Sequence, residues 1–160
     1  MTGTRKIHVL IVDDDPLTRL MASEALRESG YTSVEAEDGL RALALFDSER
    51  PDLVLLDVMM PRLGGFDVCQ HLRARPEGQL VPIIMLTGLD DGESVERAFQ
   101  VGATDFISKP INWTLLRFRI RYVLRSAQVM QELVRNKESL SSAQRIARLG
   151  SWEWFVTEDR

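Results

Sequence analysis

Leu53-Val54-Leu55-Leu56-Asp57-Val58-Met59-Met60-Pro61 is the stretch of sequence that decides the fold. Its four leading apolar residues follow Pro51-Asp52, and a run this short and apolar predicts a strand buried in a parallel sheet. The run ends on a carboxylate, Asp57, which cannot add to an apolar core. Open α/β sheets bind ligands in the crevice beyond the carboxyl ends of their strands, so we expect Asp57 at such a crevice.

Short apolar runs and amphipathic stretches alternate on both sides of this strand. They predict further strands at 7–12, 32–36, 81–87 and 104–108, and helices at 16–29, 38–48, 66–75 and 90–101, with another starting near Asn112. We expect Asp15 to cap the first helix, with Pro16 at its first position. Five strand-helix units predict an α/β fold with a five-stranded, parallel, doubly wound sheet.

Composition narrows the class of protein. The chain has 160 residues, of which 44% are hydrophobic and 28% charged, as in soluble globular proteins. No apolar run approaches the ~18 residues that span a bilayer, so no membrane contact is expected. The single cysteine, Cys69, rules out an internal disulfide and suits a reducing cytoplasm.

Charge is unevenly distributed along the chain. Residues 117–148 carry eight basic and two acidic side chains, or +6, so the remainder of the chain carries −4 − 6 = −10. A basic helix on an acidic body could contact nucleic acid or an anionic surface. A solvated helix face is the simpler interpretation, and nucleic acid is not expected as a partner of this fragment.

Polar side chains end or follow the other predicted strands. Asp13 and Asp14 follow the first strand, Thr87 ends the fourth, and Lys109 follows the fifth, in a Lys-Pro pair that invites a cis bond. Adjacent acids repel unless a cation lies between them, and adding Asp57 makes an oxygen-rich pocket suited to Mg²⁺. A lysine can neutralise a developing phosphoryl charge, and a hydroxyl can donate to its oxygen. The set predicts phosphoryl chemistry on a carboxylate with a divalent metal.

The last predicted helix has neither Pro nor Gly to end it between Ile111 and Leu149. Apolar residues in alternating 4-3 spacing predict a coiled-coil seam: Leu116, Ile120, Val123, Ala127, Met130 and Val134. We expect Gly150 to end this helix and residues 151–156 to form a short strand. Because a lone strand is not stable by itself, it would be the beginning of a further domain.

Four motifs together resemble the receiver domain of two-component response regulators. They are Ile11-Val12-Asp13-Asp14-Asp15-Pro16, Leu55-Leu56-Asp57-Val58-Met59-Met60-Pro61 with Gly64-Gly65, Leu86-Thr87-Gly88, and Asp105-Phe106-Ile107-Ser108-Lys109-Pro110. The resemblance covers residues 6 to about 125 and implies a flavodoxin-like sheet with strand order 2-1-3-4-5. It implies a receiver domain over residues 1–125, followed by a coiled-coil signalling helix over 126–149.

The resemblance also implies the metal site. Asp57 would be the phosphoacceptor, taking its phosphoryl group from a histidine kinase or phosphotransfer protein. Asp14, Asp57 and the backbone carbonyl of Met59 would ligate Mg²⁺ directly, and Asp13 would act through a metal-bound water. Lys109 would pair with the Asp57 carboxylate and then with the phosphoryl group.

A switch is implied in the same way. Thr87 would hydrogen-bond a phosphoryl oxygen, and the ring of Phe106 would turn inward as Thr87 moves. Phe stands where receivers often carry Tyr, which removes the ring hydroxyl. The change would reshape the face built by the fourth helix, fifth strand and fifth helix, through which, with the C-terminal helix, a homodimer is expected.

The C-terminal segment has a resemblance of its own. Ala143-Gln144-Arg145-Ile146-Ala147-Arg148-Leu149-Gly150-Ser151-Trp152-Glu153-Trp154 resembles the opening of a PAS sensor domain, which implies a truncated PAS-like domain from residue 150 to 160. The leading hypothesis is a receiver that signals through a dimeric helix to a PAS-containing output.

Two alternatives remain. One is a stand-alone phosphoryl shuttle, whose C-terminal extension is incidental. The other is a Mg²⁺-dependent aspartyl phosphatase of the haloacid dehalogenase type, which needs an acid two residues beyond its nucleophile, where Met59 stands. We therefore expect not an enzyme but a phosphoacceptor that assists its own phosphorylation and dephosphorylation.

Overall fold

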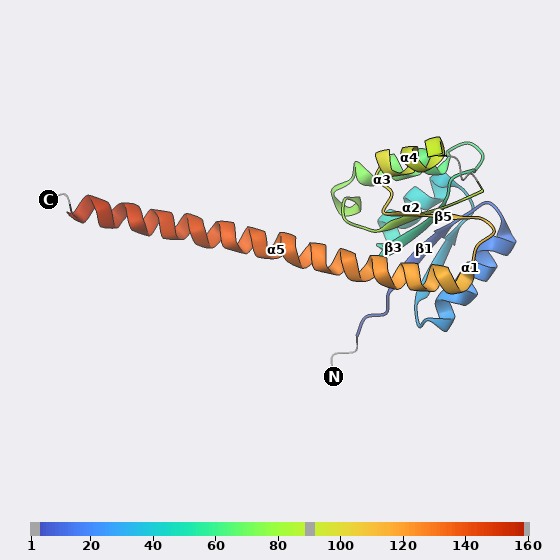
Figure 1. Cartoon of the computed structure of the whole chain (residues 1–160), viewed down its shortest axis with the longest axis horizontal. Helices are drawn as coiled ribbons and strands as arrows, with labels where there is room; N and C mark the ends of the chain where they lie inside the picture. The colour runs from blue at the N-terminus through green and yellow to red at the C-terminus, as the bar shows by residue number, and fades with distance from the viewer. Residues whose placement is uncertain (1–3, 89–91, 159–160) are drawn as a thin grey trace. The chain divides into compact units, whose positions relative to one another are not determined.

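The computed structural model describes residues 4–88 and 92–158, with side chains described up to residue 141 (Figure 1). Strands and helices alternate from the N-terminus to the last helix. In chain order they are β1 (His8–Val12), α1 (Pro16–Glu28), β2 (Thr32–Ala36), α2 (Gly39–Glu49), β3 (Leu53–Asp57), α3 (Gly65–Arg73), the 3-10 turn η1 (Pro76–Gly78), β4 (Ile83–Thr87), α4 (Gly92–Gln100), β5 (Asp105–Ser108) and α5 (Trp113–Glu158).

The five strands form one parallel sheet in the order β2-β1-β3-β4-β5, which confirms the predicted fold class and strand order. Element ends differ from the sequence-based bounds by a few residues, and η1 was not predicted. β4 begins at Ile83 rather than at residue 81. Proline has no N–H to give to the ladder, although the carbonyl of Pro82 still accepts from Val54 N at 2.9 Å.

Helices cover both faces of the sheet, and side-chain alternation along the strands decides which core each residue joins. On β3, Leu53 and Leu55 pack with α1 and α5, whereas Val54 and Leu56 pack with α2, α3 and Ala98 of α4. All five residues of β3 and of β4 are buried. A strand buried on both faces leaves only its ends for polar chemistry.

α5 continues through Gly150 to Glu158, so the expected helix end at Gly150 and the expected strand over residues 151–156 are wrong. Glycine costs a helix only about 1 kcal/mol relative to alanine, which a long helix tolerates. A lone strand, in contrast, would leave its backbone N–H and C=O groups without a neighbouring strand, whereas a helix pairs them within the segment.

The chain divides into two compact units, Met1–Arg125 and Ser126–Arg160, and α5 contributes residues to both. In the first unit, Leu116, Ile120 and Val123 of the predicted seam are buried against the sheet. In the second, Met130 and Val134 are 51% and 37% exposed. The first half of the predicted seam therefore belongs to the core of its own unit.

Within the part of the chain that the structure describes, no helix combines the length and apolar content that a membrane span requires.

Candidate functional site

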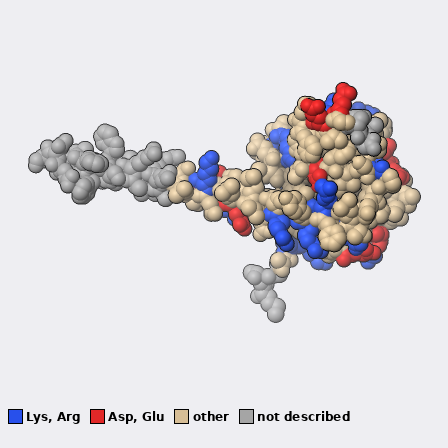
Figure 2. Space-filling view, in the orientation of Figure 1, with Lys and Arg blue, Asp and Glu red and all other residues tan. Residues whose placement is uncertain are grey.

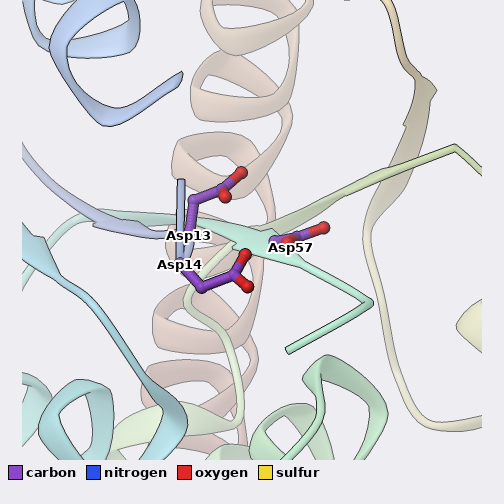
Figure 3. A group of neighbouring side chains, drawn as sticks. All are labelled: Asp13, Asp14 and Asp57. Carbon is purple, nitrogen blue, oxygen red and sulfur yellow. The ribbon is translucent and has the colours of Figure 1, made fainter. Parts of the chain in front are cut away.

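Three carboxylates meet at the carboxyl ends of the neighbouring strands β1 and β3 (Figure 3). Asp13 and Asp14 come directly after the last residue of β1, and Asp57 is the last residue of β3. One oxygen from each side chain lies within 4.8 Å of the others. Asp13 is fully buried, Asp57 is 3% exposed, and Asp14 is exposed. The acids that the sequence predicts to converge are thus neighbours in space.

Asp15 fixes the turn that presents these acids. Its carboxylate accepts hydrogen bonds from Leu17 N at 3.1 Å and Thr18 Oγ1 at 2.7 Å, which confirms the predicted N-cap of α1. Its own N–H donates to Asp13 Oδ1 at 2.9 Å. The third acid of the run therefore holds both the helix and the first acid in place.

Gly65 allows α3 to begin directly behind Asp57. A Cβ at this position would lie 2.3 Å from the backbone oxygen of Asp57 and 2.7 Å from the Cα of Val58. The N–H of Gly65 donates to Val58 O at 2.9 Å. Gly65, from the Gly64-Gly65 pair of the second motif, thus marks a close approach of backbone to the strand that carries Asp57.

Lys109 bridges two of the acids. Its Nζ lies 3.0 Å from Asp13 Oδ2 and 3.3 Å from Asp57 Oδ1. The Lys109-Pro110 peptide bond is cis, as suggested by the dipeptide, and the N–H of Lys109 donates to Thr87 O at 2.7 Å. Burial opposes the ammonium charge, but hydrogen bonds and attraction from Asp13 and Asp57 outweigh it and raise the pKa of Lys109.

Asp57 carries an unfavourable charge in this arrangement. Burial, followed by repulsion from Asp13, raises the pKa of Asp57 to about 6 from 3.8, and Lys109 offsets only part of this rise. The site gathers three carboxylates and the ammonium of Lys109, which contacts two of them, so negative charge is in surplus. Hard oxygen donors with such a surplus suit a divalent cation such as Mg²⁺.

The structure also places the other predicted site residues, which are Thr87, Phe106 and Met59. Thr87 is fully buried at the end of β4, one residue beyond Leu86, the partner of Asp57 in the sheet. Phe106 on β5 is half-buried and packs against the core on the α2–α3–α4 side of the sheet. Met59 is 63% exposed, and its N–H lies 3.4 Å from Asp57 Oδ1; its carbonyl as a metal ligand stays a prediction.

Sequence reasoning missed Arg19. Its Nη1 donates to the backbone oxygen of Asp13 at 2.7 Å, although it lies one turn into α1. No periodicity or motif distinguishes this arginine from an ordinary surface cation on an amphipathic helix.

Comparison with known proteins agrees with this geometry. The family model described as "Response regulator receiver domain" matches residues 9–121. The "Probable transcriptional regulator ycf27" of Guillardia theta is 46% identical over 120 residues, which are 75% of this chain and 46% of that protein. The "DNA-binding dual master transcriptional regulator RpaA" of Synechocystis sp. is 35% identical over 133 residues, covering 83% of this chain and 55% of that protein.

Solved structures show the same fold. The chemotaxis protein CheY4 of Vibrio cholerae superposes with a TM-score of 0.72 at 34% identity, covering 74% of this chain and 99% of that one. The chain spans about half the length of the curated regulators that it matches. Fold, site and family model coincide over the same residues, and the chain belongs to the response regulator receiver domain family.

Proposed function

We propose that this chain is a phosphorylation-dependent switch in which Asp57 accepts a phosphoryl group from a histidine kinase or phosphotransfer protein. The observation that carries the proposal is a buried carboxylate at a strand end with an ammonium 3.3 Å away and two further acids beside it. In the transfer, the P–N bond of phosphohistidine breaks as a P–O bond to Asp57 forms, and the imidazole leaves as the neutral base after taking up a proton.

Mg²⁺ fits the donor set of the three acids. Asp14 and Asp57 would hold it directly with the Met59 carbonyl, and Asp13 through a water molecule. When bound, the ion supplies positive charge that neutralises the oxygens of the transferring group. Lys109 would supply the second positive charge, and its contact with Asp57 Oδ1 keeps that charge beside the proposed acceptor carboxylate.

The switch is proposed to run from Thr87 to Phe106. Thr87 ends β4, and β5 lies beside it in the sheet, with Phe106 opposite Met85. Drawn to the phosphoryl oxygens, the Thr87 hydroxyl would vacate volume that the half-buried ring of Phe106 can fill. The face of α4, β5 and α5 would change shape as a result.

A homodimer is the proposed output geometry. In the first unit, Phe118 and Tyr122 of α5 are 61% and 70% exposed. Figure 2 shows acidic side chains over α4 and basic ones over the first turns of α5, so two copies can present opposite charges to each other. In the second unit, Val129, Leu133 and Leu140 are each exposed by more than half, as an unpartnered helix face would be.

The names of the relatives point to different outputs for a receiver. Beside the transcriptional regulators, a protein named "Cyclic di-GMP phosphodiesterase" from Thermotoga maritima is 41% identical over 118 residues, only 31% of its length. We retain the assignment of residues 150–160 to a PAS-like domain as a proposal, with residues 151–158 helical rather than extended.

One pair of experiments tests the proposal. The wild-type chain and Asp57→Asn are incubated with a small-molecule phosphodonor and Mg²⁺, and the acyl phosphate is followed by intact mass. A mass increase of one phosphoryl group is expected for wild type only, and labelling of the Asn variant would refute the assignment. Sedimentation of chains ending at residues 125 and 160, with and without beryllofluoride, then separates the dimeric switch from a monomeric shuttle.

The aspartyl phosphatase alternative has a weaker basis. Met59, two residues beyond the acceptor, presents a solvent-exposed thioether in place of the acid that such an enzyme requires.

A further inference from the structure

Arg19 connects α1 to the end of β1 and to β2. Its Nη1 donates to the backbone oxygen of Asp13 at 2.7 Å, and its Nε lies 3.3 Å from Glu35 Oε1. The side chain is only 17% exposed. Glu35 belongs to β2, so the guanidinium is held between the carbonyl of one strand end and a carboxylate of the neighbouring strand. Such a fork fixes direction as well as distance.

The other polar groups of Asp13 are also engaged. Its N–H donates to Ala36 O at 3.2 Å, Oδ1 accepts from Asp15 N at 2.9 Å, and Oδ2 accepts from Lys109 Nζ at 3.0 Å. The backbone carbonyl is the group that Arg19 holds. This carbonyl lies in the peptide plane that joins Asp13 to Asp14, and a planar peptide has only the two flanking dihedrals free to move.

Fixing that plane determines where Asp14 projects. Asp14 is exposed, unlike the buried Asp13 and Asp57, so surrounding side chains confine it less. Its position relative to the other acids must come from the backbone that carries it.

We propose that Arg19 is a positioning residue for the divalent-cation site: by holding the Asp13 carbonyl, it orients the Asp13–Asp14 peptide and thereby presents the Asp14 carboxylate to the ion. The inference rests on the proposed Mg²⁺ site. In this role Arg19 strengthens Mg²⁺ binding. Its charge alone would weaken that binding, because a cation near a metal site repels the metal.

The charge of Arg19 and its positioning role therefore predict opposite changes in Mg²⁺ affinity when the residue is replaced. If Arg19 acts through charge alone, Arg19→Gln removes a repulsion and Mg²⁺ binds more tightly. If Arg19 holds the peptide, the same change weakens binding, since loss of a group that orients metal ligands typically costs on the order of tenfold in affinity or more. Arg19→Lys keeps the charge but loses the fork, so charge alone predicts wild-type affinity, whereas positioning predicts weaker binding.

Arg41 provides the matched control. It lines the same surface hollow as Arg19, together with Glu35 and Glu37. Arg41→Gln removes a positive charge from that hollow and leaves the Arg19–Asp13 hydrogen bond in place. Its Mg²⁺ affinity should equal or slightly exceed that of wild type.

The experiment is calorimetric titration of Mg²⁺ into the full chain after treatment with a chelator, with urea unfolding in EDTA to confirm that each variant is folded. About tenfold weaker binding by Arg19→Gln and a smaller weakening by Arg19→Lys are expected. Wild-type or tighter binding by folded Arg19→Gln overturns the inference, and Arg19→Lys decides it if the Gln variant does not fold. A wild-type chain that binds no Mg²⁺ overturns the proposed metal site and this inference together, whereas normal wild-type binding with unaffected variants overturns this inference alone.

Discussion

Replacing Asp57, the proposed phosphoacceptor, should stabilise the metal-free protein. The pKa of Asp57 is about 6 in the folded chain, because of burial and the neighbouring Asp13, against 3.8 for an ordinary aspartate. A raised carboxyl pKa means that the folded state binds the proton more tightly than the unfolded state. The destabilisation by the Asp57 charge is therefore absent below pH 3.8, grows between pH 3.8 and about 6, and is constant above that value.

The size of the effect follows from the same two values. A rise in the Asp57 pKa from 3.8 to about 6 lowers the free energy of unfolding by roughly 3 kcal/mol at pH 7.5. At pH 4.5, where the charge is only partly formed in the folded state, proton linkage gives a loss of about 1 kcal/mol. Asp57→Asn keeps the shape of the side chain and removes the charge. We expect the free energy of unfolding of the variant to exceed that of wild type by about 1–3 kcal/mol at pH 7.5, or roughly 3–10 °C in Tm. The difference should be smaller at pH 4.5.

Urea unfolding in EDTA at both pH values measures this difference in unfolding free energy between Asp57→Asn and wild type. Asp67→Asn, at an exposed position in the first turn of α3, controls for loss of a carboxylate and should show no comparable gain. Excess Mg²⁺ should narrow the gap, because it binds the wild-type carboxylates and stabilises that folded state. A variant less stable than wild type at pH 7.5, or a gap independent of pH, would refute the reasoning.

Three further changes test other parts of the site and its support. Lys109→Met removes the ammonium that competes with a metal ion for Asp13, so calorimetry should show tighter Mg²⁺ binding. Because the variant leaves a buried carboxylate unpaired, urea unfolding of the metal-free chain should show a free energy of unfolding lower by about 1–3 kcal/mol. Gly65→Ala places a Cβ 2.3 Å from backbone oxygen, which should cost about 1–3 kcal/mol and slow phosphorylation, whereas Gly92→Ala, with open space around it, should do neither. Arg73→Met removes donors from three backbone carbonyls at 2.6–2.9 Å and should destabilise the fold by about 3 kcal/mol without changing Mg²⁺ affinity.

The sheet was predictable because its signals are local. β3 and β4 are apolar over their whole length until they reach Asp57 and Thr87, and this is what burial on both faces of a parallel sheet requires. The role of Asp15 was also predictable, since an acid before proline is a standard helix start. Parallel strands bring their carboxyl ends to one edge, so the convergence of the acids followed from topology.

The features that the sequence could not reveal depend on groups distant along the chain or on competition between structures. The contact of Arg19 with a backbone oxygen leaves no periodic signal. Spacing alone predicts the seam on α5, and spacing does not say that Leu116 and Ile120 pack against the sheet of their own unit. Glycine often ends helices, so Gly150 predicts a helix end, yet a helix without a competing partner for its backbone continues.

The position of Lys109 suggests how phosphorylation alters the balance of charge. Its ammonium lies 3.0 Å from an oxygen of Asp13 and 3.3 Å from one of Asp57, so the two buried carboxylates share one cation. A phosphoryl group brings close to two negative charges to the Asp57 side, and we expect the ammonium to follow it at the expense of Asp13. Asp13 would then depend on the metal for compensation, which would couple the proposed switched state to the ion. The Nζ resonance of Lys109 should therefore shift when beryllofluoride and Mg²⁺ are added together; an unchanged resonance in a chain that binds both would contradict this transfer of the ammonium.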